Sequence, residues 1–153
     1  MSVAFRRDSD EEHLEPRFEL PLPPGPNLVT RRGHDLVKSR TEGLETAVTA
    51  AASDQERAKL QRDLRYWRAR LATAQIAPPA IGDAVAFGTR VTIEQAGRAR
   101  TLTIVGHDEA DPPSGTIAFA SPLAQALMGA EAGEDISLPG GATSSRVVSI
   151  EPM

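Results

Sequence analysis

Residues 60–74 carry the pattern that most restricts the fold of this chain. Apolar side chains recur there in alternating steps of four and three residues, the a/d repeat of a helix packed along another helix. They are Leu60, Leu64, Trp67, Leu71 and Ala74. A similar stripe precedes them, formed by Val37, Leu44, Ala47, Val48 and Ala51. The two stripes predict an antiparallel helical hairpin over residues 30–75, which turns at residues 52–56 and has Thr30 as the N-cap of its first helix.

The chain changes character after Ala77-Pro78-Pro79, because two consecutive prolines cannot continue a helix. Beyond them apolar residues alternate, which is typical of strands. One helix interrupts this pattern: Ser121 and Pro122 open it, Leu123, Leu127 and Met128 face inward, and Gly129 ends it. The predicted strands cover residues 83–87, 90–95, 100–105, 116–120, 135–138 and 146–150.

The predicted fold class is therefore α+β, an N-terminal helical hairpin or coiled coil followed by an antiparallel sheet domain with one helix. We place the hairpin at residues 29–77 and the sheet domain at residues 78–153. Residues 1–28 form an acidic, proline-rich leader that we expect to be extended. Its leucines and Phe18 would suffice for a short docking motif, and an unfolded tail is the other interpretation.

Charge is distributed unevenly along the chain. Residues 1–29 hold three basic and six acidic side chains, residues 30–76 hold ten and six, and residues 77–153 hold four and nine. Only the hairpin is basic, and its second helix carries a stripe of Arg62, Arg65 and Arg68. Such a stripe can contact phosphates or an acidic partner, or can be a solvated helix face.

Several classes of function are excluded or disfavoured by composition. The chain has no cysteine, so it forms no disulfide or thiolate metal site, and His13, His34 and His107 lack the spacing of metal ligands. No apolar run is long enough to span a membrane, and the first residues lack the apolar core of a signal peptide. We expect a cytoplasmic protein without a membrane partner.

Three segments of the predicted sheet domain carry a resemblance to a known family. They are Val85-Ala86-Phe87-Gly88, the sequence IVGHDEAD at 104–111 and the sequence SPLAQALMG at 121–129, followed by Gly133-Glu134. In this order they resemble the C-terminal domain of the bacterial GreA/GreB transcript-cleavage elongation factors. The resemblance extends over residues 28–151, and residues 1–27 have no counterpart in the standard factors.

The resemblance implies a fold and a mode of action. An FKBP-like C-terminal domain would dock on the rim of the secondary channel of bacterial RNA polymerase, with Ser121, Pro122 and Leu123 near the docking surface. The coiled coil would enter the channel, where acidic tip residues help to hold Mg²⁺ at the polymerase active site while the polymerase hydrolyses backtracked RNA. The chain would then be a monomeric accessory factor and not an enzyme, with no catalytic residue and no cofactor bound alone. The resemblance also implies that the basic stripe, unless it is a solvated face, touches the channel walls or the nascent RNA 3′ end, and it suggests DNA binding.

The predicted tip departs from the family pattern. The family has an Asp and a Glu three residues apart, whereas Asp54 and Glu56 here are two apart and Arg57 follows them. Both carboxylates are candidates to hold Mg²⁺ at the polymerase active site, and both can instead serve as caps of the second helix. The first helix, at about 33 Å for residues 30–51, is two to three turns shorter than in the family.

These departures leave other functions open. A short hairpin also resembles the non-cleaving regulators of nucleoside diphosphate kinase, which share the docking domain. A dimeric adaptor would use the helical seam between two chains. We discount a prolyl isomerase, because two of the four aromatic residues available for its pocket, Tyr66 and Trp67, lie in the hairpin while Phe87 and Phe119 lie in the sheet domain.

Overall fold

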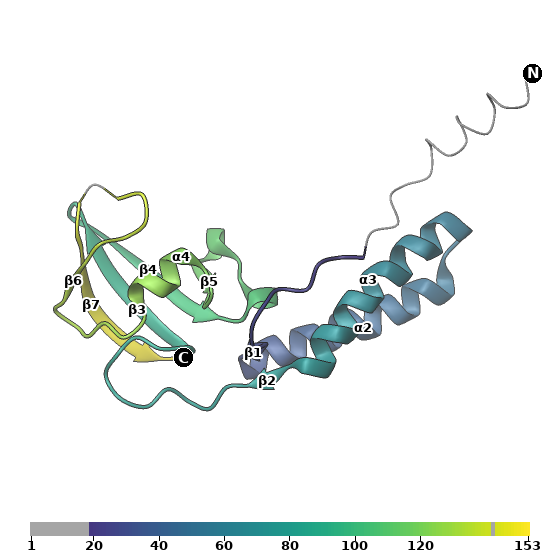
Figure 1. Ribbon diagram of the computed structural model, residues 1–153, viewed down its shortest axis with the longest axis horizontal. Coiled ribbons are helices and arrows are strands. Elements are labelled where there is room, and N and C mark those ends of the chain that lie inside the picture. The colour runs from purple at the N-terminus through teal and green to yellow at the C-terminus, as the bar shows by residue number, and fades with distance from the viewer. Residues whose placement is uncertain (1–18, 142) are drawn as a thin grey trace, which may run out of the picture.

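The structure, a computed structural model, describes residues 19–141 and 143–153. A helical hairpin and a sheet-containing head lie end to end in an elongated molecule (Figure 1). The predicted leader, residues 1–28, falls largely outside the described residues. Of its described part, residues 19–27 contain no helix or strand, and Leu28 lies in a short strand. Within the described residues, no helix is both long and apolar enough to cross a bilayer.

The hairpin consists of α2 (Arg31–Ala50) and α3 (Asp54–Thr73), each of 20 residues and thus about 30 Å long. Thr30 is the N-cap of α2, because its hydroxyl accepts a hydrogen bond of 2.9 Å from the Gly33 N–H. Val37 and Leu64 are buried, and the remaining residues of the two predicted stripes are half-buried between the helices. The predicted hairpin and its intrachain seam are confirmed.

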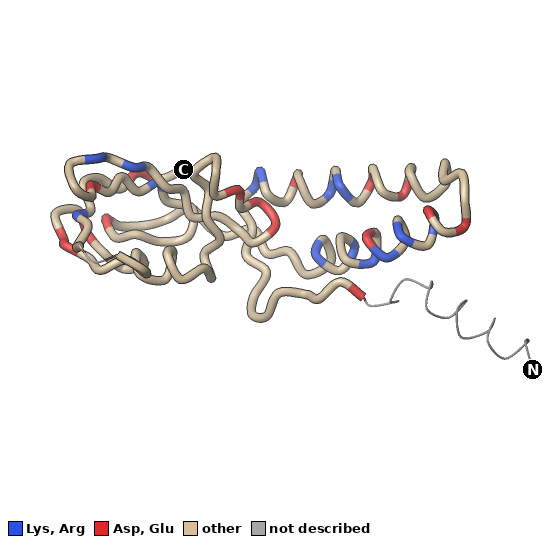
Figure 2. The backbone as a smooth tube through the Cα atoms, turned by 90° about the horizontal axis from the view of Figure 1, so that it is seen from above, with Lys and Arg blue, Asp and Glu red and all other residues tan. Residues whose placement is uncertain are grey.

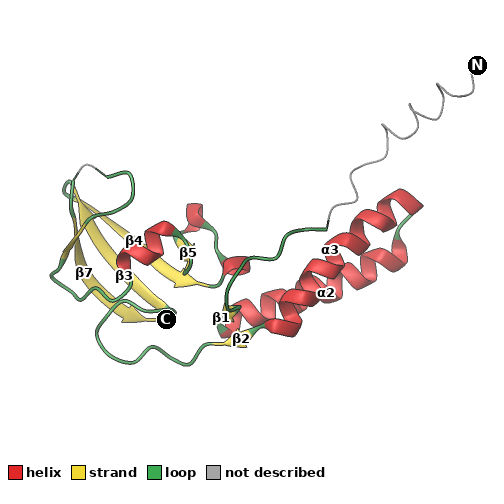
Figure 3. Ribbon diagram, viewed as in Figure 1, coloured by secondary structure: helices red, strands yellow, loops and turns green. Residues whose placement is uncertain are grey.

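A two-stranded clasp closes the base of the hairpin. Strand β1 (Leu28–Val29) runs parallel to β2 (Gln75–Ile76), with Leu28 opposite Gln75 and Val29 opposite Ile76. The Gln75 N–H donates to the Asn27 carbonyl at 2.9 Å, and the Ala77 N–H donates to the Val29 carbonyl at 3.0 Å. The two ends of the hairpin therefore lie side by side where they meet the head (Figure 3).

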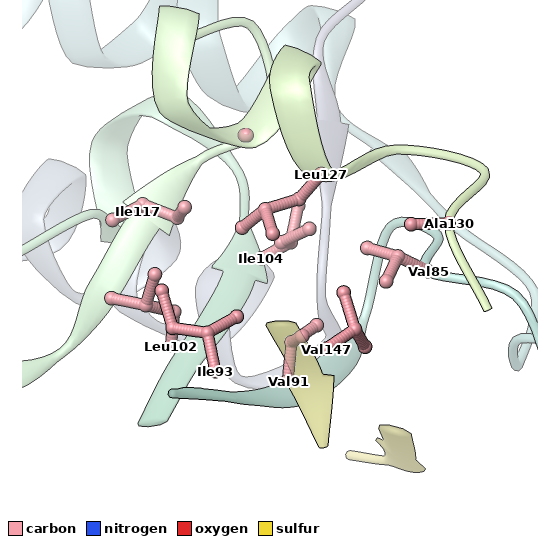
Figure 4. Close-up of a cluster of buried hydrophobic side chains, with 10 residues drawn as sticks. Val85, Val91, Ile93, Leu102, Ile104, Ile117, Leu127, Ala130 and Val147 are labelled. Carbon is pink, nitrogen blue, oxygen red and sulfur yellow. The ribbon is translucent and has the colours of Figure 1, made fainter. Parts of the chain in front are cut away.

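The head is a five-stranded sheet in the order β5-β4-β3-β7-β6, with one short helix, α4 (Pro122–Leu127). Its strands are β3 (Thr89–Gln95), β4 (Arg98–Val105), β5 (Thr116–Ala118), β6 (Asp135–Ile136) and β7 (Ser145–Pro152). Two 3-10 turns, η1 (His107–Glu109) and η2 (Pro112–Ser114), connect β4 to β5. Alternate residues of β3 face the core, where Val91 and Ile93 pack with Leu127 of α4 and Val147 of β7 (Figure 4). The predicted α+β class is confirmed.

Three details of the prediction are wrong. Residues 83–87 are not a strand, because Gly82 and Gly88 adopt positive φ angles and bend the chain at both ends, leaving one isolated bridge from Ala84 to Glu131. The sheet is mixed rather than antiparallel, because residues 106–115 carry the chain back along β4 before β5 pairs parallel to it. Met128 is 37% exposed, and Ala124 takes the inward position on α4 instead.

Candidate functional site

The hairpin tip contains the two predicted acidic candidates, Asp54 and Glu56. Ser53 is the N-cap of α3, and its hydroxyl accepts from the Glu56 N–H at 3.1 Å. The Glu56 carboxylate in turn accepts from the Ala52 N–H at 3.1 Å, one residue ahead of the usual capping-box position. Glu56 is therefore tied to the backbone at the start of α3, in the capping role that the sequence left open.

Asp54 lies at the outermost turn of the same helix. Its side chain has a relative exposure of 101%, and one oxygen accepts from the Arg57 guanidinium at 2.8 Å. Arg57 also donates to the Ala51 carbonyl at 3.2 Å, so it links the two helices across the tip. The tip thus presents one fully exposed carboxylate beside one cation.

These two carboxylates are oxygen donors of the kind that Mg²⁺ prefers. The described residues contain no group of three or more side chains that could hold a metal ion on their own. Asp54 and Glu56 therefore fit a role as supplementary ligands only, at an ion whose remaining ligands come from another molecule.

Arg65 and Arg68 of the predicted basic stripe form ion pairs. Arg65 donates from Nε to both Glu19 oxygens at 3.0 Å and from Nη2 to one of them at 2.7 Å. Arg68 pairs with Glu45 of α2 at 3.1 Å. Arg62 contributes to the lowered pKa of Glu19, whose main cause is the hydrogen bond from Arg65. Figure 2 shows that basic residues recur along both helices of the hairpin.

The junction between hairpin and head contains a buried polar network that the sequence did not reveal. Arg70 of α3 and Asp108 of η1 form an ion pair of 2.6 Å, and their side chains are 6% and 4% exposed. Asp108 also accepts from the Tyr66 hydroxyl, and Arg70 donates to the Asn27 side chain at 2.7 Å. Asn27 donates back to the Arg70 carbonyl at 2.8 Å, which joins leader, helix and head in one network.

Tyr66 reports on this environment. Burial, followed by the hydrogen bond to Asp108 and the charge of that carboxylate, raises the pKa of Tyr66 to about 12. Tyr66 belongs to α3 and Asp108 to η1 in the head. Their direct contact, across 42 residues of sequence, shows that both help to fix the head on the hairpin.

A second set of contacts attaches the head to the other helix. Glu109, the residue after Asp108, accepts a hydrogen bond of 2.5 Å from the Thr30 hydroxyl. A Cβ at Gly33 would lie 2.5 Å from the same Glu109 oxygen, and a Cβ at Gly106 would lie 2.4 Å from the Leu28 carbonyl. Glycine at both positions therefore permits the close approach of η1 to the base of α2 and to the clasp.

The predicted docking residues lie at the start of α4, in the head and far from the tip (Figure 1). Ser121 is the N-cap and accepts from the Ala124 N–H at 3.3 Å. Pro122 occupies the first turn and is exposed, whereas Leu123 is partly buried against the core. Of the three, Pro122 offers most surface to a partner.

Comparisons with known proteins match both parts of this molecule. A family model described as "Transcription elongation factor, GreA/GreB, C-term" matches residues 79–152, which is the head. Transcription elongation factor GreB of Xanthomonas axonopodis pv. citri is 31% identical, and the alignment covers 88% of this chain and 96% of that protein, so it includes the hairpin. The chain belongs to the GreA/GreB family.

Other GreA/GreB relatives align mainly over one part of the chain. Transcription elongation factor GreA of Desulfovibrio desulfuricans is 39% identical over 93 residues, 57% of each chain. In this and two further GreA alignments the chain spans about half the length of the relative. Among solved structures, GreA factor homolog 1 (Gfh1) of Thermus thermophilus is 23% identical, with a TM-score of 0.42 over 83% of this chain and 99% of that one.

Family membership supports the expected link to transcription elongation, and none of these comparisons supports DNA binding.

The structure shows where the acidic residues of segment 108–111, inside the family match, are located. Asp108 and Glu109 lie at the joint with the hairpin, and Asp111 accepts from the Ser114 hydroxyl at 2.6 Å in the next turn. The sequence signal that could have indicated this joint is an arginine near the end of α3, Arg70, together with two adjacent acidic residues in the head, Asp108 and Glu109.

Proposed function

We propose that this chain binds bacterial RNA polymerase in the cytoplasm at the secondary channel and modulates transcription elongation there. The observation that carries the proposal is the elongated geometry, a hairpin of about 30 Å held on the head by a buried network, with the exposed Asp54 at its far end. In this arrangement the head docks through the surface around Pro122, with Ser121 and Leu123 supporting it, and the hairpin reaches into the channel.

In the proposed role the chain acts as an accessory monomer, and the reaction is that of the polymerase. Asp54, with Glu56 beside it, would add oxygen ligands to a Mg²⁺ ion at the polymerase active site, where the metal activates water for hydrolysis of RNA. Arg62, Arg65 and Arg68 would face the channel or the nascent RNA 3′ end. The monomer is favoured over a dimeric adaptor because the seam that an adaptor would use between chains is filled by α2 and α3 of one chain.

A second candidate, a non-cleaving channel regulator, is favoured by the contacts at the tip. The Glu56 carboxylate accepts from a backbone N–H, and the Asp54 carboxylate accepts from Arg57. Both contacts compete with metal ligation. In addition, α2 and α3 have only 20 residues each, which limits how far the tip reaches. A regulator of this kind would occupy the channel without supplying metal ligands.

Transcript cleavage by stalled polymerase complexes separates the two candidates. We expect the wild-type chain to stimulate cleavage, and the Asp54→Ala variant to lose at least about ten-fold of that stimulation, as when one group of a catalytic constellation is removed. Glu42→Ala is the matched control, since Glu42 is an exposed carboxylate of α2 away from the tip. A wild-type chain that binds polymerase without stimulating cleavage would establish the regulator instead.

Polymerase binding tests the docking surface separately. We expect Pro122→Ala to weaken binding, because Pro122 is exposed at the start of α4, and Pro113→Ala, in an exposed turn of the head, to leave it unchanged. Equal affinities for the two variants would remove the α4 surface from the proposal.

A further inference from the structure

Residues 19–27 of the leader are fixed firmly at one end. Asn27 is 5% exposed, and it exchanges hydrogen bonds with the side chain and the carbonyl of Arg70. It also donates to the Thr73 hydroxyl at 3.1 Å. The leader therefore leaves the base of α3 from an anchored position.

The other end of this segment is held by an exposed, hydrogen-bonded ion pair. Glu19 accepts three hydrogen bonds from the Arg65 guanidinium, and the two side chains remain 63% and 54% exposed. Apolar contacts add little to this attachment, because the nearby side chains of Leu20 and Leu22 are 41% and 55% exposed. An exposed ion pair of this kind is screened by salt and contributes little to stability.

Chain length does not force Glu19 onto Arg65. An extended segment of eight residues can span about 25 Å, whereas five residues of helix separate Arg65 from Arg70 by about 8 Å. The slack is taken up by a bend at Pro24-Gly25, where Gly25 has a φ of 85°. Glu19 thus has a wide range of positions available and occupies the one that its charge selects.

From these contacts we propose that residues 19–26 form a displaceable strap on the Arg62–Arg65 surface of α3, and that Glu19 occupies the position of an acidic side chain of a partner protein. Because the guanidinium of Arg65 already binds a carboxylate on an extended peptide segment, acidic protein side chains fit the same surface. The tether keeps Glu19 at a high effective concentration, so the partner must displace it. The identity of that partner as RNA polymerase rests on the proposed function.

The free protein provides the first test, which does not involve polymerase. Heteronuclear NOE values for the backbone amides of Leu20 and Leu22 report whether the strap is held. We expect Glu19→Gln to lower both values, Glu42→Gln to leave them unchanged, and the charge swap Glu19→Arg with Arg65→Glu to restore them. Unchanged values in Glu19→Gln would overturn the strap.

Binding to nucleic-acid-free polymerase provides the second test. We expect Glu19→Gln to bind about two- to five-fold more tightly than wild type at low salt, the range of one exposed ion pair. Glu42→Gln, which removes the same charge, should not change the affinity, and Glu19→Gln should have no effect in an Arg65→Gln background. The gain should shrink at high salt.

Three outcomes of the binding test would overturn the inference. Equal affinities of Glu19→Gln and Glu42→Gln would show that the strap does not limit access. A gain confined to elongation complexes that contain RNA would show that phosphate, and not an acidic side chain, competes for Arg65. If no variant binds polymerase, the proposed function fails, while the NOE measurements still decide whether Glu19 holds the strap.

Discussion

Arginine–carboxylate ion pairs occur in two opposite surroundings in this molecule. One is the joint, where hairpin and head meet around Arg70 and Asp108, and the other is the shaft, the exposed surface of α2 and α3. At the joint, Arg70 and Asp108 are almost completely buried, and Tyr66 and Asn27 complete their hydrogen bonds. Along the shaft and tip, arginine pairs with glutamate or aspartate at the surface, with both partners largely exposed. Burial turns the first pair into a fixed connection between head and hairpin, whereas the others can open without a large change in free energy.

The largest expected effect comes from breaking the buried pair. Asp108→Ala leaves the Arg70 guanidinium buried without its counter-charge, and we expect it to lower the free energy of unfolding by about 3–5 kcal/mol. Urea denaturation measures this change. Asp135→Ala, which removes the partner of the exposed Arg146, is the matched control and should not shift the curve measurably. Similar curves for the two variants would show that burial does not distinguish the pairs.

The close backbone approach at the joint gives the next effect. In Gly106→Ala the new Cβ would lie 2.4 Å from the Leu28 carbonyl, so the clasp must move, at a cost of about 1–3 kcal/mol in unfolding free energy. Gly43→Ala is the counterpart in α2: among the described residues, no atom outside its own stretch of helix lies within 4 Å of the new Cβ, and alanine should stabilise α2 by about 1 kcal/mol. Thermal unfolding of both variants would contradict the comparison if the two changes had the same sign.

Tyr66 permits a direct measurement of the joint, because it is the only tyrosine in the chain. Tyrosinate absorbance should titrate near pH 12 in the folded protein and near the ordinary pKa of about 10 in urea. Since folding favours the protonated phenol, its contribution to stability is complete below pH 10 and is lost as the pH rises through 12. Asp108→Asn should lower the folded-state pKa, and an unchanged titration would remove Asp108 as a cause.

The smallest expected effect lies on the shaft. Glu45→Gln removes the exposed partner of Arg68, and we expect the free energy of unfolding to change by less than about 1 kcal/mol. Urea denaturation alongside Asp108→Ala measures both ends of the comparison in one experiment. A loss of several kcal/mol here would mean that the helices depend on their surface ion pairs.

Local patterns predicted what local interactions determine. The four-three repeat around Leu64 indicated the hairpin, and Ser121-Pro122 indicated the start of α4, because caps and seams depend on neighbours a few residues away. The predicted strand at 83–87 was wrong because its alternation did not reveal the bends at Gly82 and Gly88. The sequence of β5, only three residues long, likewise gave no indication that this strand pairs parallel to β4.

In the candidate site, too, local features could be predicted from the sequence and long-range contacts could not. The placement of Asp54 and Glu56 at the tip followed from the turn between two helices, and their use as Mg²⁺ ligands stays a prediction. The network at the joint joins residues 38 to 43 positions apart, and the leader contact joins Glu19 to Arg65 across 46. Such pairings depend on how the head packs against the hairpin, and sequence periodicity and motif spacing do not predict that arrangement.

The parallel clasp of β1 and β2 has a consequence for how the length of the hairpin can vary. Because both ends of the hairpin are attached at the same place, residues added in equal number to α2 and α3 move the tip outward and leave the clasp and the Arg70–Asp108 joint in place. One heptad in each helix would extend the tip by about 10 Å. Reach can therefore be lengthened or shortened by insertion or deletion while the attachment to the head stays the same.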